Sequence, residues 1–108
     1  MTEGEKRRGS CIVYMLRCKG DRLYTGVTNN LARRVSEHRS ACAGAKFTRA
    51  FPPETIAAAW ETDSRSAALK LESRIKKLTR VKKDRLIETN DFSVLPERTE
   101  NESYRRIR

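Results

Sequence analysis

Two apolar runs near the start of the chain, separated by a polar turn, predict a pair of strands. Residues 11–18 (CIVYMLRC) are β-branched, aromatic or aliphatic in the main, and residues 22–28 (RLYTGVT) follow the turn residues Lys19, Gly20 and Asp21. This arrangement is typical of a β-hairpin. Because residues 1–10 lack apolar periodicity, we expect them to form a disordered leader, with the fold beginning at Cys11.

Apolar residues at helical spacing predict three helices further along the chain. Leu31 and Val35 lie four positions apart behind two asparagines that can cap a helix, so a helix is expected over residues 31–40. A second helix is expected after Asp63 or Ser64, and a third from Thr79. Their apolar positions are Ala68, Leu71, Ile75 and Leu78, and then Val81, Leu86 and Ile87.

The remaining segments complete the predicted order of elements. Residues 41–53 are predicted to form a loop, and residues 54–61 (ETIAAAWE) a third strand. The order β-β-α-β-α-α predicts an α/β (α+β) domain over residues 11–89, in which helices flank a small, mostly antiparallel three-stranded sheet. Residues 90–108 are polar and mixed in charge, which predicts a flexible tail.

The charge of the chain narrows the class of partner. Lys and Arg number 24 against 14 Asp and Glu, a formal net charge of +10, and most of this excess lies between Cys11 and Asn90. A compact basic domain is suited to a polyanion such as DNA, RNA or an anionic membrane, although a merely solvated basic surface has the same composition.

The length of the apolar runs and the number of cysteines argue against several other classes of protein. No run approaches the about 20 apolar residues that a membrane span needs, and residues 1–10 contain no signal-peptide core, so we expect a cytoplasmic protein without a membrane role. The three cysteines form an odd set without a C-x-x-C pair, which argues against a disulfide framework and a structural zinc site.

Five side chains could carry chemistry. Tyr14 and Tyr24 stand ten positions apart on the two arms of the hairpin, and Arg34 and His38 leave the same face of the next helix. Glu72 lies at the margin of the apolar face of the following helix, where a carboxylate can hold a hard divalent cation. Each has a plainer interpretation: cross-strand aromatic packing, a solvated arginine, a surface histidine, and an ion pair of Glu72 with the lysine four positions on.

Taken in order, these residues resemble one known family. Ile12-Val13-Tyr14, Tyr24-Thr25-Gly26, Arg34-x-x-x-His38 and a helical Glu72 are similar to the GIY-YIG nuclease superfamily. The sequence around these motifs, such as GAKFTR and SRSAALKLESRIKKL, also resembles the small stand-alone bacterial members of this superfamily. These members are related to the N-terminal nuclease domain of a DNA-repair excinuclease. The resemblance covers Cys11 to Ile87. It departs from the superfamily's tripeptides at Ile12, where the name has Gly, and at Thr25, where it has Ile.

The resemblance implies a metal-dependent endonuclease that hydrolyses phosphodiester bonds in DNA, structure-selective or weakly specific, in DNA repair or recombination. By similarity, Glu72 would hold one Mg²⁺ or Mn²⁺ ion and Arg34 would bind the scissile phosphate. Tyr14 would activate water, with its proton passing on through His38, and Tyr24 would position water or phosphate. The roles of the two tyrosines could be exchanged.

Basic side chains near these residues could grip the backbone of the nucleic acid. We expect this role for residues of the loop and the helices, namely Arg33, Lys46, Thr48, Arg49, Arg74, Lys76 and Lys77. Two rival interpretations remain open: a non-catalytic nucleic-acid-binding module on the same fold, and a small basic RNA- or ribosome-associated protein. The sequence leaves open DNA against RNA, the oligomeric state, and whether a partner protein supplies targeting.

Overall fold

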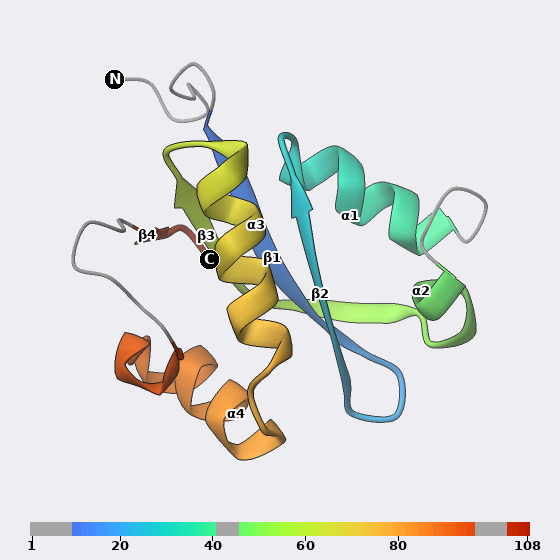
Figure 1. Cartoon of the computed structure of the whole chain (residues 1–108). Helices are drawn as coiled ribbons and strands as arrows, with labels where there is room; N and C mark the ends of the chain where they lie inside the picture. Colours follow the sequence, from blue (N-terminus) through green and yellow to red (C-terminus); the bar gives the residue numbers. More distant parts are fainter. Residues whose placement is uncertain (1–9, 41–45, 97–103) are drawn as a thin grey trace.

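The computed structural model describes residues 10–40, 46–96 and 104–108, and shows a single antiparallel sheet with helices on both faces (Figure 1). The strands are β1 (Cys11–Cys18), β2 (Arg22–Thr28), β3 (Pro53–Thr62) and β4 (Tyr104–Arg106), in the spatial order β2-β1-β3-β4. The helices are α1 (Leu31–Ser40), α2 (Lys46–Ala50), α3 (Arg65–Lys76) and α4 (Arg80–Thr89), followed by a 3₁₀ turn, η1 (Phe92–Val94). The predicted α/β class is confirmed, but the sheet has a fourth strand.

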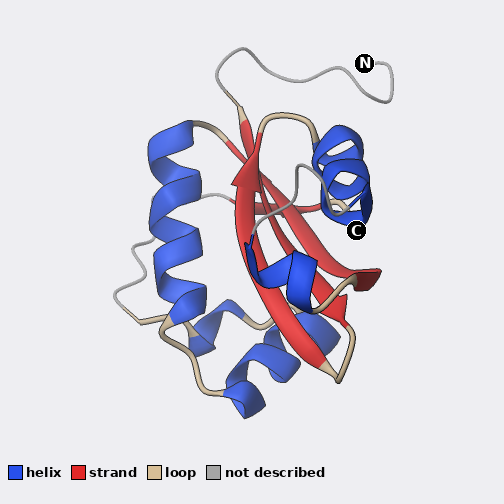
Figure 2. Cartoon of the chain, turned by 90° about the vertical axis from the view of Figure 1, so that its right-hand side faces the viewer, coloured by secondary structure: helices blue, strands red, loops and turns tan. Residues whose placement is uncertain are grey.

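β1 is the central strand, and both of its faces are covered. Val13 and Met15 belong to the core beneath α3 and α4, whereas Ile12, Tyr14 and Leu16 belong to the core beneath α1 and α2. Figure 2 shows α3 and α1 on opposite sides of the sheet. A strand buried on both faces needs apolar residues at consecutive positions, which is why residues 11–16 lack the alternation of a half-exposed strand.

Small residues in β3 allow the two helical layers to approach the sheet closely. Ala58 and Ala59 are both fully buried, and because neighbouring residues of a strand point to opposite faces, Ala58 meets the α3 layer and Ala59 the α1 layer. The alanine run therefore belongs to a strand despite the helical propensity of alanine. Ser64 and Thr79 accept hydrogen bonds from the first turns of α3 and α4, as expected for N-caps.

The segment predicted as a loop over residues 41–53 contains the short helix α2, so that prediction is wrong for residues 46–50; residues 41–45 lie outside the described part. Five residues are too few to show a helical period. α2 is instead stabilised by tertiary contacts, because the ring of Phe47 packs against Tyr24 and Phe51, with centroids 5.8 and 5.2 Å apart.

The flexible tail predicted after Asn90 also needs correction. Leu95, just beyond η1, is buried in the core beneath α3 and α4, and β4 pairs with the end of β3. Arg106 of β4 places its guanidinium over the ring of Trp60 at 5.3 Å and donates to the carbonyl of Ile87 at 3.0 Å. These contacts are made at long range, so a local polar pattern could not reveal them. Residues 97–103, and residues 1–9 of the leader predicted over residues 1–10, lie outside the described part.

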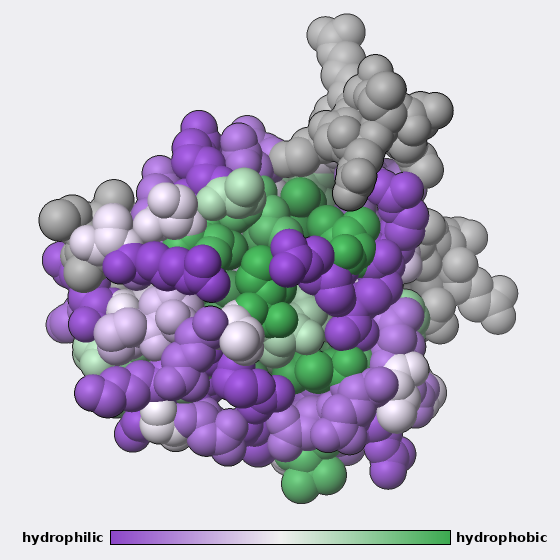
Figure 3. All heavy atoms as spheres, turned by 180° about the vertical axis from the view of Figure 1, so that it is seen from behind, coloured by the Kyte–Doolittle hydropathy of each residue, from purple (hydrophilic) through white to green (hydrophobic). Residues whose placement is uncertain are grey.

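Hydrophilic residues surround the apolar patch visible on the rear face in Figure 3. Among the helices that the structure describes, none is long and apolar enough to cross a membrane.

Asn90 ends α4 and ties it to β3, which gives a first test of the fold. Its backbone is left-handed (φ 56°), and its side-chain oxygen accepts from the indole N–H of buried Trp60 at 2.8 Å. Asn90→Ala should lower the free energy of unfolding by about 1–3 kcal/mol, since the indole donor loses its partner. Asn90→Asp, which keeps an acceptor oxygen, should lose less. Urea denaturation measures both, and equal losses would contradict the assigned role of the hydrogen bond.

Candidate active site

Four of the five predicted catalytic side chains gather where β1, β2 and α1 meet. The ring centroids of Tyr14 and Tyr24 lie 6.2 Å apart, and the imidazole of His38 lies 5.8 Å from the first and 5.0 Å from the second. Arg34 comes from α1, one helical turn before His38. The tyrosines do form the aromatic pair of the plainer interpretation, but their association with α1 goes beyond cross-strand packing.

Gly26 makes room for the Tyr14 ring. The two residues are directly opposite each other in the β1–β2 ladder, and a Cβ atom on Gly26 would lie 2.5 Å from the Tyr14 hydroxyl oxygen and 2.7 Å from its Cζ. Only glycine permits so close an approach. The phenol oxygen of Tyr14 therefore lies over Gly26 of β2, the outer strand of the sheet.

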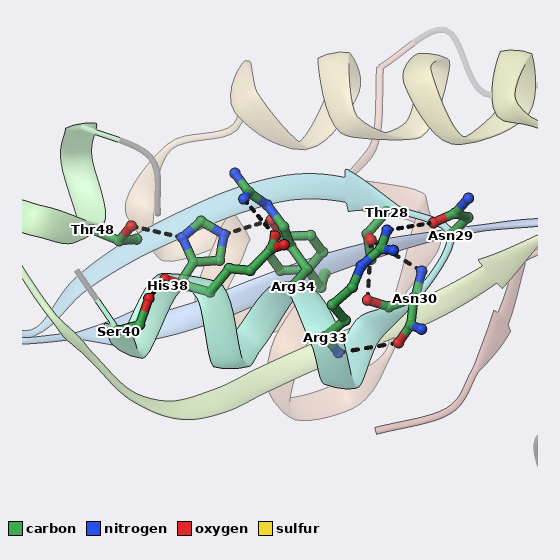
Figure 4. Close-up of polar contacts among 10 residues, drawn as sticks. Thr28, Asn29, Asn30, Arg33, Arg34, His38, Ser40 and Thr48 are labelled. Atoms are coloured by element: carbon green, nitrogen blue, oxygen red, sulfur yellow. Dashed lines mark hydrogen bonds and ion pairs between the residues drawn. The ribbon is translucent and has the colours of Figure 1, made fainter. Parts of the chain in front are cut away.

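His38 is fully buried between two hydroxyl groups (Figure 4). Its Nε2 lies 2.8 Å from the Tyr14 hydroxyl and its Nδ1 lies 2.6 Å from Oγ1 of Thr48. Burial lowers the pKa of His38, the positive charge of Arg34 lowers it further, and Glu37 opposes them. The imidazole is therefore neutral at pH 7, with one nitrogen donating and the other accepting. A surface histidine, the plainer interpretation, is excluded.

Tyr14 carries its proton in this environment. Burial is the main cause that raises the pKa of the phenol to about 12, and electrostatic interaction with Tyr24 and with the Glu72 carboxylate acts in the same direction. Arg34 lowers the pKa of Tyr14 through a hydrogen bond and through its charge, without cancelling the effect of burial. The phenol is thus protonated at neutral pH and is not itself a base. To accept a proton from water, it must first pass its own proton to an acceptor.

Arg34 is partly exposed and oriented by its own helix. Its Nη1 donates to the carboxylate of Glu37 at 3.0 Å, and hydrogen bonds to Glu37 and Tyr14 raise its pKa. The guanidinium has five donors, so these bonds leave capacity for a phosphate oxygen.

Glu72 approaches from the opposite layer of the molecule. α3 packs against β1 and β2, and the Glu72 carboxylate is close enough for its charge to raise the pKa of Tyr14. Its side chain is 20% exposed and pairs with Lys76 at 3.3 Å, the ion pair of the plainer interpretation. Both features fit a carboxylate at the margin of the buried face, as predicted.

The carboxylate of Glu72 is suited to hold one divalent cation that keeps most of its water ligands. In residues 10–40, 46–96 and 104–108, no three His, Cys, Asp or Glu side chains come together as metal ligands. Mg²⁺ is commonly held by one or two carboxylates while it keeps several waters, so the partly exposed Glu72 is a sufficient protein ligand. Lys76 would have to release the carboxylate.

The residues predicted to grip nucleic acid fall into three groups. Arg33, Lys46, Arg49, Lys76 and Lys77 are exposed. Arg74 donates to the Tyr104 hydroxyl at 3.0 Å, and because it lies two positions from Glu72 it leaves another side of α3. Thr48 is 1% exposed and bound to His38, so its predicted contact with nucleic acid is corrected.

The sequence analysis gave no role to Gly26, and it assigned Thr48 to nucleic-acid binding rather than to the contact with His38. Both residues lie within the motifs that carry the family resemblance, Tyr24-Thr25-Gly26 and GAKFTR, but their contacts depend on tertiary structure. A threonine between Phe47 and Arg49 in a short, partly basic segment gives no sign that it is buried.

Comparison with known proteins identifies the family of the chain. Residues 10–85 match the profile of the GIY-YIG catalytic domain. The chain belongs to the GIY-YIG family. This membership places it in a superfamily of endonucleases, which act on nucleic acid and generally depend on a divalent metal.

Several small proteins of similar length are related to the chain. A UPF0213 protein of Natronomonas pharaonis is 48% identical over 75 residues, covering 69% of this chain and 87% of the relative. One from Desulfotalea psychrophila is 37% identical over 87 residues, covering 81% and 79%. The solution NMR structure of the UPF0213 protein BH0048 from Bacillus halodurans is 38% identical, covers 72% of this chain and 82% of its own, and has a TM-score of 0.48. These names state no activity.

The neutral state of His38 predicts a pH dependence. We expect the imidazole to titrate below its ordinary pKa of 6.5, because burial and Arg34 disfavour the charged form. The unfolded chain then binds the proton at higher pH than the folded chain, so the free energy of unfolding falls as pH drops below about 6.5. NMR titration of the single histidine measures the midpoint, and His38→Gln should lose this part of the pH dependence. A midpoint above 6.5 would contradict the burial argument.

Gly26→Ala tests the close approach of Tyr14. The added methyl group would collide with the phenol, which cannot move away without losing His38, so we expect a loss of about 1–3 kcal/mol in the free energy of unfolding. In a Tyr14→Ala background the same change should be almost neutral. A double-mutant cycle by urea denaturation measures this coupling, and additive losses would rule out the contact as the cause.

Proposed function

We propose that this chain is a metal-dependent endonuclease that hydrolyses phosphodiester bonds in DNA, acting in DNA repair or recombination. One observation carries the proposal: the Tyr14 hydroxyl is bound to both His38 and Arg34, and lies within electrostatic reach of Glu72. Hydrolysis needs a proton acceptor for water, positive charge on the phosphate, and a site for a metal ion. These four side chains supply all three.

Tyr14 and His38 act together to activate water. The Tyr14 phenol, which is protonated at neutral pH, passes its proton to Nε2 of His38 and takes one from the attacking water. Arg34 favours this transfer because its positive charge stabilises the phenolate. The hydrogen bond to His38 supports Tyr14 as the base, and it leaves Tyr24, stacked edge-on against the imidazole, to position the water or the phosphate.

Arg34 and Glu72 act on the phosphate from the two sides of the sheet. The guanidinium of Arg34 donates to the phosphoryl oxygens and counters the charge that develops in the transition state. Glu72 would hold one Mg²⁺ or Mn²⁺, and the ion, when bound, supplies Lewis-acid stabilisation of the leaving 3′ oxygen. For this, Glu72 exchanges its contact with Lys76, an ion pair of the kind that contributes only about 0.3–0.5 kcal/mol.

The exposed cations suit the backbone of a polynucleotide. Lys46 and Arg49 lie on α2, Arg33 on α1, Lys76 in the last turn of α3 and Lys77 at its C-cap, so these cations belong to elements that also carry or contact site residues. Backbone contacts carry no sequence information, so we expect selectivity for structure, or weak selectivity, together with strong dependence on salt. A partner protein could supply targeting.

A cleavage assay tests the proposal. Labelled single-stranded, duplex, flap and branched DNA would be incubated with the protein and Mg²⁺, Mn²⁺ or EDTA. We expect cutting only with metal, and a loss of at least ~100-fold in Glu72→Gln, because the ion loses its protein ligand. The matched control is Glu88→Gln, an exposed glutamate of α4, which should cut normally.

Two other results would count against the proposal. Cutting by Glu72→Gln at the wild-type rate would show that this carboxylate does not hold the metal. Binding of DNA without cutting, under every metal condition, would favour the non-catalytic module, for which the Glu72–Lys76 ion pair is the structural argument.

A further inference from the structure

Thr48 contacts the side of His38 that faces away from Tyr14. Its hydroxyl is 2.6 Å from Nδ1, and the side chain is buried. The neighbouring Phe47 packs α2 against the ring of Tyr24, so the hydroxyl is held in place by contacts within the site itself. The mechanism above does not use this contact.

The hydrogen bonds of Tyr14 decide which nitrogen of His38 carries the proton. Arg34 can only donate, so the phenol oxygen accepts from Arg34 and cannot give its own proton to that residue. Tyr14 is 1% exposed, and a buried O–H needs an acceptor. Nε2 of His38, at 2.8 Å, is the acceptor that the described contacts offer.

The relative acidity of the two hydroxyl groups leads to the same assignment. A phenol is a stronger hydrogen-bond donor and a weaker acceptor than an aliphatic alcohol. A neutral imidazole between Tyr14 and Thr48 therefore accepts from the phenol at Nε2 and donates its one N–H, at Nδ1, to the threonine oxygen.

We propose that Thr48 is a positioning residue, which holds His38 in the Nδ1–H tautomer so that Nε2 can take the proton of Tyr14. This inference rests on the proposed nuclease mechanism. In the transfer, the O–H bond of Tyr14 breaks, its electron pair stays on the phenolate oxygen, and a new N–H bond forms at Nε2. Nδ1 and Thr48 keep their protons throughout, and His38 loses the extra proton to solvent before the next turnover.

Loss of the Thr48 oxygen would reverse the tautomer. Among the residues that the structure describes, the other groups that act on His38 are Tyr24, which meets the imidazole edge-on, and Arg34 and Glu37 on its own helix. Without an acceptor, a buried Nδ1–H is disfavoured, and the proton moves to Nε2. It would then point at the Tyr14 oxygen and block the transfer.

The test compares Thr48→Val, which has nearly the same shape but no hydroxyl, with Thr48→Ser, which keeps the hydroxyl. His38 is the only histidine, so ¹⁵N labelling of histidine reports its two ring nitrogens without ambiguity. We expect Nδ1–H in the wild type and in Thr48→Ser, and a shift to Nε2–H in Thr48→Val. Nε2–H in the wild type, or an unchanged tautomer in Thr48→Val, would overturn the proposal.

Cleavage kinetics provide the second measurement. Thr48→Val should lose roughly 10-fold in kcat with little change in KM, and Thr48→Ser should stay near the wild type. A normal kcat in folded Thr48→Val would overturn the proposal. If Thr48→Val does not fold, the spectra of the wild type and Thr48→Ser still decide the tautomer. A wild type that has the Nδ1–H tautomer but cuts no nucleic acid would count against the proposed function alone.

Discussion

Burial of the Tyr14 hydroxyl is the constraint on which the arrangement of the site depends. A central strand covered on both faces sends every side chain into a core, and a polar group there must find partners within the protein. Tyr14 finds them on α1, in His38 and Arg34, and His38 in turn finds Thr48 on α2. One buried hydroxyl thus fixes the position of two helices relative to the sheet.

The charged groups of the site are each balanced within their own helix. Arg34 pairs with Glu37 three positions on, and Glu72 with Lys76 four positions on. Such pairs near the surface are weak and easily exchanged, whereas the uncharged chain of Tyr14, His38 and Thr48 is enclosed. The domain therefore combines an enclosed, neutral chain of hydrogen bonds with charged groups that can change partners when an anion or a cation binds.

The sequence predicts those parts of the structure that depend on local pattern. The hairpin over residues 11–28 and the helix over residues 31–40 agree with the structure because their apolar spacing is continuous. β4 depends on Arg106 reaching Trp60, and α2 on Phe47 reaching Tyr24, contacts between residues far apart in the sequence. The five proposed catalytic residues are recognisable by type and order. The burial of His38 and its contact with Thr48 depend on the tertiary structure, and a short polar segment carries no sign of them.

The alanines of β3 lie between the two helical layers that carry the proposed catalytic residues. Ala58 lies under the helix that carries Glu72, and Ala59 under the helix that carries Arg34 and His38. At this strand the two helical layers are separated by the backbone of the sheet with one methyl group on each face. A bulkier residue at either position would separate the carboxylate from the guanidinium without touching either. The spacing between the two layers that carry the proposed catalytic residues therefore depends on side chains that have no functional group.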